Sequence, residues 1–294
     1  MILVQRVPDT LAGRRLDEIL VQLFPDHSRQ TMRRVIDWGG CAIDGICCRV
    51  ASRTLSGGEE ITVGIMEQER CIDLHYTSDD MLYEDDDYLA VNKESGVNSQ
   101  RTPYQLKGTV EFAVSCYLRR QGIAEPARVV HRLDRGTSGV IFFPKNRRSA
   151  THISTLLRDG KVEKVYWALT RTVPSLDEWV VDLPIGKVSR FRYGVDPRGK
   201  PATTRFRVIC TSAWGALVEA HPLTGRTHQI RVHLEHSGYP VLGDTPYGGV
   251  PAPRLMLHCR RMAFRSQRGK DVAAEAPLDR AFTDLLTAWG IDAE

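Results

Sequence analysis

The feature that most constrains the fold is a polar loop between two apolar runs in residues 129–143. Val129 and Val130 precede the loop, and an apolar run of residues 140–143 follows it. Apolar, β-branched and aromatic runs favour buried strands, and a loop between two core strands holds its side chains rigidly. The loop contains one carboxylate, Asp134, with two arginines and a histidine. These residues alone fit either a reactive site or a surface turn with an Asp–Arg ion pair.

Residues 81–294 mix strand-like and helix-like segments, which predicts one α+β domain. The predicted strands are two around the acidic turn in 81–96, one in 161–170 and a hairpin in 204–223. The predicted helices are 109–122, 152–160 and 227–238, of which the last two end at Gly160 and Gly238.

Residues 12–63 predict a smaller unit with the order helix, helix, hairpin and strand. Apolar residues recur at helical spacing in 16–23, and Ser28 is predicted to cap the second helix. Asp44-Gly45 is a hairpin signal. Arg29 and Arg33 share a face of the second helix, which suits contacts to RNA phosphates.

Composition limits the class of protein. No stretch approaches the roughly 20 apolar residues that span a membrane, and we expect no signal peptide, because no basic segment precedes a long apolar run. Seven cysteines at irregular spacing favour a reducing cytoplasm over a disulfide framework. Cys41, Cys47 and Cys48 lie close together without C-x-x-C spacing, so we expect packing rather than metal binding. The net charge of +4 permits RNA binding without requiring it.

Residues 131–139 read H-R-L-D-R-G-T-S-G and resemble the H-R-L-D-x-x-T-S-G signature of the pseudouridine synthases that act on ribosomal and transfer RNA. Further motifs of this family follow in order: K-x-Y-x-A at 164–168, T-G-R-T-H-Q-I-R-V-H at 224–233, G-D-x-x-Y-G at 243–248 and L-H at 257–258. Residues 92–96 depart from the family's K-P-x-G motif, because Glu94 replaces proline. The resemblance spans residues 80 to 265.

The resemblance implies an RNA-modifying isomerase with a mixed, largely antiparallel central sheet and an active-site cleft. The reaction moves the bond between uracil and ribose from nitrogen 1 to carbon 5, so no cofactor or metal is expected. By resemblance, Asp134 is the catalytic carboxylate, Arg231 pairs with it, and Tyr166 packs against the target uracil. Tyr166 is also a candidate for the proton step at carbon 5, since a phenol can stack and exchange a proton. Whether Asp134 attacks the ribose, adds to the base or removes a ribose proton stays open.

The target base must leave its stack to be modified. Arg132 is the candidate to fill the gap, and a structural salt bridge is an equal alternative. Leu257 is predicted to form an apolar wall of the pocket, with core packing as the alternative. For His131, a structural hydrogen bond is favoured over a catalytic role. The residues assigned to substrate binding are His131, Arg132, Arg226, Leu257, Lys93, Arg29 and Arg33.

The N-terminal region resembles the small αL RNA-binding domain of the ribosomal-protein S-four type. The resemblance rests on Arg15-Leu16-Asp17, Ser28-Arg29 and the hairpin of residues 40–45, in which Asp44 replaces the usual Asn. We therefore predict an RNA-binding domain in 1–66, a linker in 67–80 and the catalytic domain in 81–294.

Two other functions compete with this prediction. A non-catalytic RNA-binding protein could keep the fold, but the aspartate, tyrosine and arginine are all present. A hydrolase that uses Asp134 is disfavoured, because the chain lacks a G-x-S-x-G elbow and a metal motif. We expect a monomer that acts on RNA, with ribosomal RNA favoured over transfer RNA and no membrane partner.

Overall fold

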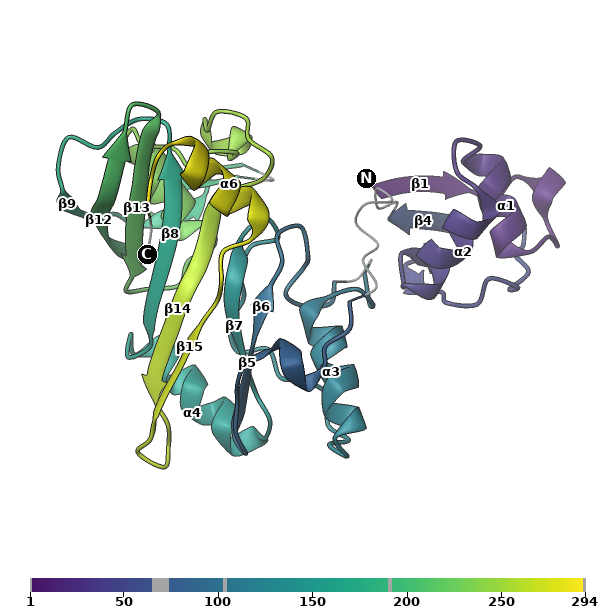
Figure 1. Ribbon diagram of the computed structural model, residues 1–294. Helices are drawn as coiled ribbons and strands as arrows, with labels where there is room; N and C mark the ends of the chain where they lie inside the picture. The colour runs from purple at the N-terminus through teal and green to yellow at the C-terminus, as the bar shows by residue number, and fades with distance from the viewer. Residues whose placement is uncertain (1, 65–73, 103–104, 190–191, 293–294) are drawn as a thin grey trace. The chain divides into compact units, whose positions relative to one another are not determined.

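The computed structural model describes residues 2–64, 74–102, 105–189 and 192–292 (Figure 1). Internal contacts divide the chain into two compact units, one of residues 1–75 with 97–126 and the other of residues 76–96 with 127–294. Residues 67–73 of the predicted linker lie outside the described residues. The proposed functional boundaries at 66 and 80 stay a prediction.

The first unit contains a four-stranded antiparallel sheet with the order β1-β4-β2-β3. Its strands are β1 (Ile2–Arg6), β2 (Cys41–Ile43), β3 (Ile46–Cys47) and β4 (Glu60–Gly64), and its helices are η1 (Asp9–Leu11), α1 (Leu16–Leu23), α2 (Arg29–Asp37) and α3 (Val110–Arg120). The predicted helices, hairpin and last strand are confirmed. β1 was not predicted, because four of its five residues are exposed and no alternation marks it.

Local chemistry explains where these elements begin and turn. Ser28 Oγ accepts a hydrogen bond of 3.1 Å from the Thr31 N–H and thereby caps α2, as predicted. The β2–β3 turn has positive φ at both central residues, 48° at Asp44 and 78° at Gly45. A type I′ hairpin requires this geometry, which Asp and Gly adopt at low cost.

The second unit is built on a nine-stranded sheet with the order β5-β6-β7-β14-β8-β13-β12-β9, and β15 pairs with β14. Its strands are β5 (Met81–Glu84), β6 (Tyr88–Lys93), β7 (Ser138–Pro144), β8 (Glu163–Thr170), β9 (Glu178–Asp182), β12 (Thr203–Ser212), β13 (Gly215–Pro222), β14 (Leu257–Arg265) and β15 (Asp271–Glu275). A two-stranded ribbon, β10 (Ile185–Lys187) and β11 (Tyr193–Val195), completes the strands, and the helices are η3 (Ser78–Asp80), α4 (Arg147–Arg158), α5 (Gln229–His236), η4 (Thr245–Tyr247) and α6 (Arg280–Ala288). The predicted α+β class with a mixed, largely antiparallel sheet is confirmed, since the pairing of β7 with β14 is the parallel one.

The centre of this sheet positions the site. Every residue of β7 is buried, and the loop that carries Asp134 leads directly into it. β14 lies between β7 and β8, with Leu257 at its start and Tyr166 in the middle of β8 (Figure 1). Residues that are far apart in the sequence therefore meet across three neighbouring strands.

Gly139 permits the close approach of β7 and β14. Its φ is +112°, and a Cβ placed on it would lie 2.2 Å from the carbonyl oxygen of Cys259. That atom belongs to the backbone of a buried central strand and cannot move aside cheaply. Only glycine fits at this position.

Gly139→Ala should therefore lower the free energy of unfolding by about 3 kcal/mol, through the backbone clash and the unfavourable φ. The measurement is urea denaturation followed by circular dichroism. Gly225→Ala is the matched control, because a Cβ at Gly225 meets nothing within 4 Å. Equal stability of the two variants would contradict this account of the β7–β14 contact.

Candidate active site

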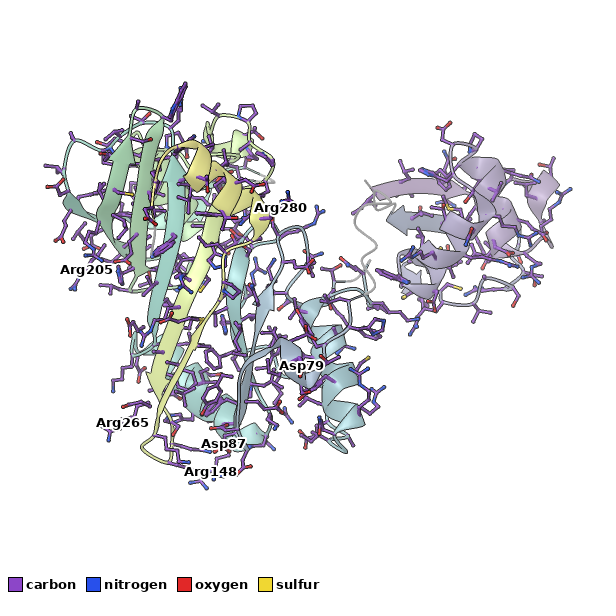
Figure 2. The ribbon with its side chains drawn as sticks, in the orientation of Figure 1. Asp79, Asp87, Arg148, Arg205, Arg265 and Arg280 are labelled. Atoms are coloured by element: carbon purple, nitrogen blue, oxygen red, sulfur yellow. The ribbon has the colours of Figure 1, made fainter. Side chains whose placement is uncertain are left out.

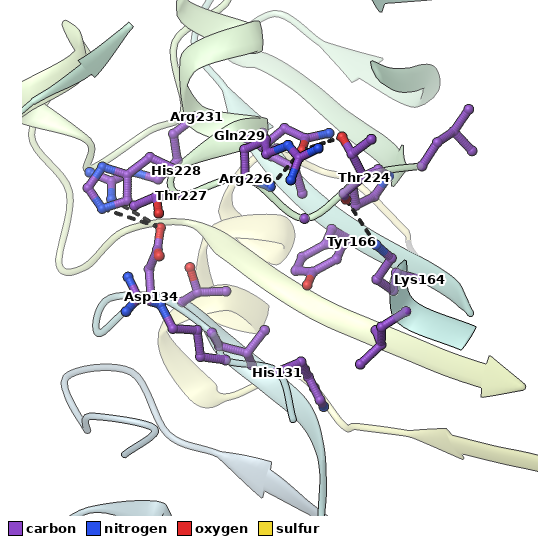
Figure 3. Close-up of a pocket in the computed structure, with 18 of the residues that line it drawn as sticks. His131, Asp134, Lys164, Tyr166, Thr224, Arg226, Thr227, His228, Gln229 and Arg231 are labelled. Atoms are coloured by element: carbon purple, nitrogen blue, oxygen red, sulfur yellow. Dashed lines mark hydrogen bonds and ion pairs between the residues drawn. The ribbon is translucent and has the colours of Figure 1, made fainter. Parts of the chain in front are cut away.

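A cavity of about 530 Å³ opens on the second unit, over β8 and the start of β14 (Figure 3). Its wall comes from five segments: the loop of residues 130–137, α4, β8, residues 222–231 and the start of β14. Seven of the predicted site residues line it: His131, Arg132, Asp134, Tyr166, Arg226, Arg231 and Leu257. The structure thus gathers most of the predicted site into one cavity.

Asp134 and Arg231 form the predicted pair. Arg231 Nη1 donates to Asp134 Oδ2 at 3.3 Å. The same guanidinium also makes a shorter, bidentate pair with Asp244, with distances of 2.6 Å from Nε and 2.7 Å from Nη2. Asp244 is 1% exposed. A bidentate contact fixes the plane of a guanidinium, so Asp244 determines the direction in which Nη1 reaches Asp134.

Sequence reasoning assigned no role to Asp244, although it quoted the G-D-x-x-Y-G motif that contains it. The tyrosine of that motif, Tyr247, also supports the site. The centre of its ring lies 4.7 Å from the Arg231 guanidinium carbon, and its hydroxyl is 2.7 Å from His228 Nδ1. The G-D-x-x-Y-G motif was the sequence signal for Asp244 and Tyr247. The fold is needed to see that both side chains contact Arg231.

His228 borders Asp134 from the other side. Its backbone has φ of +58°, and its Nε2 lies 3.8 Å from Asp134 Oδ2. Burial lowers the pKa of His228, although the Asp134 charge opposes the shift. The imidazole is therefore predominantly neutral at pH 7 and places a polar edge, rather than a cation, beside the carboxylate.

Tyr166 lines the cavity, with Lys164 near it (Figure 3), and Leu257 is also a lining residue. Burial raises its pKa well above the ordinary value, with smaller contributions from Cys259 and Asp134. Its phenol therefore keeps its proton at neutral pH. Leu257 is 3% exposed and meets both expectations, since it lines the cavity and belongs to the core.

Lys164 is a buried amine in the cavity wall that the sequence analysis did not select. Its Nζ donates to the Thr224 carbonyl at 3.0 Å, and burial lowers its pKa to about 8. Its place in the K-x-Y-x-A motif was the only signal. The contact joins β8 to the loop that carries Arg226.

His131 has a structural hydrogen bond, as the alternative interpretation expected. Its Nε2 accepts a hydrogen bond of 2.9 Å from the Phe142 N–H, and burial lowers its pKa to about 4. A nitrogen that accepts a hydrogen bond carries no proton, so His131 is neutral. It lines the cavity and fixes the loop to β7.

Lys93 lies beneath the Asp134 loop rather than in the cavity wall. It is fully buried, and its Nζ donates to the carbonyls of Glu94 at 2.8 Å and Arg135 at 3.1 Å. Three more bonds tie the same segments together: Gly96 N–H to the Arg135 carbonyl, Arg135 Nε to the Gly96 carbonyl and Ser95 Oγ to the Gly136 carbonyl. These contacts give Lys93 a structural role in holding the Asp134 loop, and its assignment to substrate binding stays a prediction.

Two arginines at the cavity meet different surroundings. Arg132 is exposed, and the described residues place no carboxylate within 4 Å of its guanidinium. The salt bridge considered for Arg132 is therefore not formed within the described part of the chain. Arg226 Nε donates to the Pro201 carbonyl at 2.9 Å, which directs its side chain along the rim.

Arg29 and Arg33 lie in the first unit and have a partner there that the sequence analysis missed. Both donate to Asp17 Oδ2, at 3.1 Å from Arg29 Nε and 2.7 Å from Arg33 Nε, and Arg15 bonds the other oxygen. Burial opposes ionisation of Asp17, but the three guanidinium hydrogen bonds hold its pKa well below the ordinary value. Asp17 is fully buried while the two arginines stay about half exposed. The pairing orders their side chains and leaves their outer faces open.

No group of three or more His, Cys, Asp or Glu side chains in the described chain could hold a metal ion. The described helices include none that is long and apolar enough to cross a membrane. The six cysteines at 41, 47, 48, 116, 210 and 259 are free thiols.

A family model described as RNA pseudouridylate synthase matches residues 87–236. The chain belongs to this family of enzymes. The ribosomal large subunit pseudouridine synthase D of Haemophilus ducreyi is 30% identical over 312 residues, which cover 99% of this chain and 96% of that protein. The corresponding synthase D of Nitrosomonas europaea is 32% identical over 298 residues, which cover 96% and 86% of the two chains. The predicted family and enzyme class are confirmed.

Solved structures agree on the fold of this synthase. Human RNA pseudouridylate synthase domain containing 4 superposes with a TM-score of 0.63 at 24% identity, covering 74% of this chain and 95% of that chain. Human RNA pseudouridylate synthase domain containing 1 gives a TM-score of 0.55 at 25% identity, covering 75% and 100%.

Asp244→Asn should lower the free energy of unfolding by about 3 kcal/mol, because it leaves the buried Arg231 guanidinium without its bidentate partner. Pseudouridine formation should fall at least ten-fold, since Nη1 loses its fixed direction toward Asp134. Urea denaturation and single-turnover release of tritium from carbon-5-labelled uridine measure the two effects. Asp284→Asn is the control, because Asp284 is 68% exposed in a loose pair with Arg280. An Asp244→Asn variant with wild-type activity would show that Asp244 does not orient Arg231.

Lys93 predicts a pH dependence of stability. Burial lowers the pKa of Lys93 to about 7, whereas an unfolded lysine titrates near about 10.4. Between these values the unfolded chain binds more protons, so stability rises with pH. From pH 7 to pH 9 the free energy of unfolding of the wild type should rise by about 2 kcal/mol relative to Lys93→Met. Lys270→Met, at an exposed lysine, should follow the wild type; equal pH slopes for wild type and Lys93→Met would refute the prediction.

Proposed function

We propose that this synthase converts specific uridines of large-subunit ribosomal RNA to pseudouridine. The support comes from relatives in Haemophilus ducreyi and Nitrosomonas europaea, whose names refer to the large ribosomal subunit and which align over nearly the whole chain. A relative in Bacillus subtilis that is 31% identical over 92% of this chain is named only as an uncharacterized RNA pseudouridine synthase. Ribosomal RNA is therefore favoured over transfer RNA.

In this proposal Asp134 is the catalytic group. The observation that carries it is an aspartate at the cavity wall, paired with an arginine that a second, buried carboxylate holds in place. In the reaction the bond from nitrogen 1 to the ribose breaks, a bond from carbon 5 forms, and the carbon-5 proton leaves. An ionised carboxylate can act on the ribose or the base in this sequence. Arg231 holds the carboxylate, and Tyr166 and Leu257 form the surface on which the uracil packs.

The enzyme reaches its uridine by flipping it out of the RNA. Arg132 is the proposed group that occupies the vacated space, because it is exposed at the cavity and a guanidinium stacks on bases. The N-terminal residues 1–66 are the proposed RNA-binding domain, in which the outer faces of Arg29 and Arg33 contact phosphates. We further propose a monomer that acts in the cytoplasm without metal or cofactor.

Asp134→Asn tests the proposal directly. Asn keeps the shape of the side chain but is a far weaker nucleophile and base, so the variant should fold, bind RNA with near-normal affinity and form no pseudouridine. The assay is single-turnover tritium release with enzyme in excess over unmodified large-subunit ribosomal RNA, which removes product release from the measurement. Tritium release by Asp134→Asn at the wild-type rate would remove Asp134 from the mechanism. If the wild type releases tritium only from transfer RNA, the substrate proposal is wrong.

Tyr166→Phe separates stacking from proton transfer. Phe keeps the ring and removes the hydroxyl, so RNA affinity should stay within about two-fold of the wild type. The phenol keeps its proton at neutral pH. The hydroxyl can therefore take the proton from carbon 5 only if it passes its own proton on at the same time. We expect single-turnover tritium release at least ten-fold slower than wild type; full activity would leave Tyr166 the stacking role alone.

A further inference from the structure

The outward face of α4 carries an exposed stripe that leads away from the cavity. Residues 147, 151, 154 and 158 recur at spacings of four, three and four, so they lie on one side of the helix. Six exposed residues on this stripe and at its two ends are Arg147, Arg148, Thr151, Ser154, Arg158 and Lys161, and Asp159 and Gly160 are exposed at the same end as Arg158. We call these six residues the α4 stripe. Four of the six are cations, and the one exposed acidic residue among them in sequence, Asp159, pairs with Arg158.

The stripe is continuous with the cavity. Ser154 and Arg158 line the cavity together with Leu157, whereas Arg147 and Arg148 do not. Eleven residues separate Arg147 from Arg158, which is about 16 Å along a helix. Figure 2 shows Arg148 near the end of the unit, with Asp87 and Arg265, while Arg280 lies near the other end. A polymer whose reacting residue occupies the cavity can therefore continue along α4.

The charges of the α4 stripe differ from those on neighbouring surfaces. Arg260, Arg261 and Arg268 of this unit are all held in ion pairs with carboxylates. Among the described residues, neither Arg147 nor Arg148 has a carboxylate within 4 Å. The Asn146 cap at this end of α4 bonds Asp87, but Asp87 is already paired with Arg268 at 3.0 Å. Ion pairing therefore does not account for Arg147 and Arg148. Among the described residues it does not account for the exposed Arg205 and Arg265 either, but Arg147 and Arg148 lie on the helix that lines the cavity.

Helix stability does not explain why Arg147 and Arg148 occupy these positions either. They occupy the first turn of α4, which contains no acidic residue. Positive charge in a first turn opposes the helix dipole and is unfavourable for the helix. Arg158 has a partner, Asp159 at 3.1 Å, but its side chain is 72% exposed, and such surface pairs bind weakly.

We propose that the α4 stripe binds the phosphates of the RNA strand that flanks the target uridine. This inference rests on the proposed function and adds to it a place for the RNA outside the cavity. Arg158 and Lys161 hold the strand near the reacting nucleotide, and Arg147 and Arg148 hold it further along. RNA is the occupant that fits, because the stripe is cationic, is polar throughout and begins at the site where the enzyme takes a nucleotide.

The test is the double variant Arg147→Gln/Arg148→Gln, which removes two charges and keeps good helix formers. The matched control is Arg171→Gln/Arg280→Gln, which also removes two charges from exposed arginines of the same unit that lie outside the cavity wall. Binding to unmodified large-subunit ribosomal RNA transcribed in vitro is measured by filter retention at several KCl concentrations between 50 and 200 mM. Thermal unfolding by circular dichroism checks that both variants fold.

The double variant should bind about ten-fold more weakly near 100 mM KCl than the control. Its plot of log affinity against log salt should be shallower by about 1.4, at about 0.7 per lost contact to a single strand. The loss should appear in KM more than in kcat. If the double variant and the control have the same affinity and salt slope, the stripe serves some other anion or none, and the proposal is overturned. Tritium release by the wild type reports separately on the proposed function.

Discussion

The close pairing of β7 with β14 is the constraint on which the site depends. Parallel neighbours in an otherwise antiparallel sheet bring the start of β7 beside the start of β14, with Ser138 opposite His258 and Gly139 opposite Cys259. Ser138 Oγ lies 2.8 Å from His258 Nδ1, which fixes the same register through side chains. The Asp134 loop enters at this point, so any shift of the two strands would move the carboxylate relative to Tyr166 on β8.

Around that point, backbone groups and a second carboxylate hold the polar side chains of the site in place. Asp244 holds Arg231 from behind, Lys93 donates to two carbonyls beneath the loop, and His131 accepts a hydrogen bond from a backbone N–H at its side. The charge of Asp134 favours protonated Lys93, although burial dominates the shift of its pKa. Buried groups with several fixed partners have little freedom to reorient. The carboxylate is therefore aimed before any RNA arrives.

Local sequence patterns predicted the elements that have strong local signals. The helices ended by Gly160 and Gly238, the Asp44-Gly45 hairpin and the Ser28 cap all follow from chemistry within a few residues. The short strands β10 and β11 have three residues each, too few for a readable alternation. The family resemblance selected Asp134, Arg231 and Tyr166, and the structure brings these three residues to one cavity.

The supporting residues could not be predicted, because their partners are distant in sequence. Asp17 meets Arg29 and Arg33 only when α1 packs against α2, and helical spacing within α2 gives no sign of it. Asp244 meets Arg231 only when the loop before η4 returns to α5. Lys93 was assigned to substrate binding, and its sequence position gave no sign that the fold buries it beneath the Asp134 loop.

Within the second unit, the buried cations and the exposed cations have different roles. Buried or half-buried basic side chains such as Lys93, Lys164 and Arg231 donate hydrogen bonds to carbonyls or carboxylates, and these bonds hold the cavity in place. Exposed cations at the cavity mouth have fewer partners, and Arg132 has no carboxylate within 4 Å among the described residues. Screened, exposed charges attract a polyanion over about a Debye length without fixing its sequence. The exposed cations therefore suit contacts with a flexible polyanion, and the bonded cations suit a site whose side chains have little freedom to move.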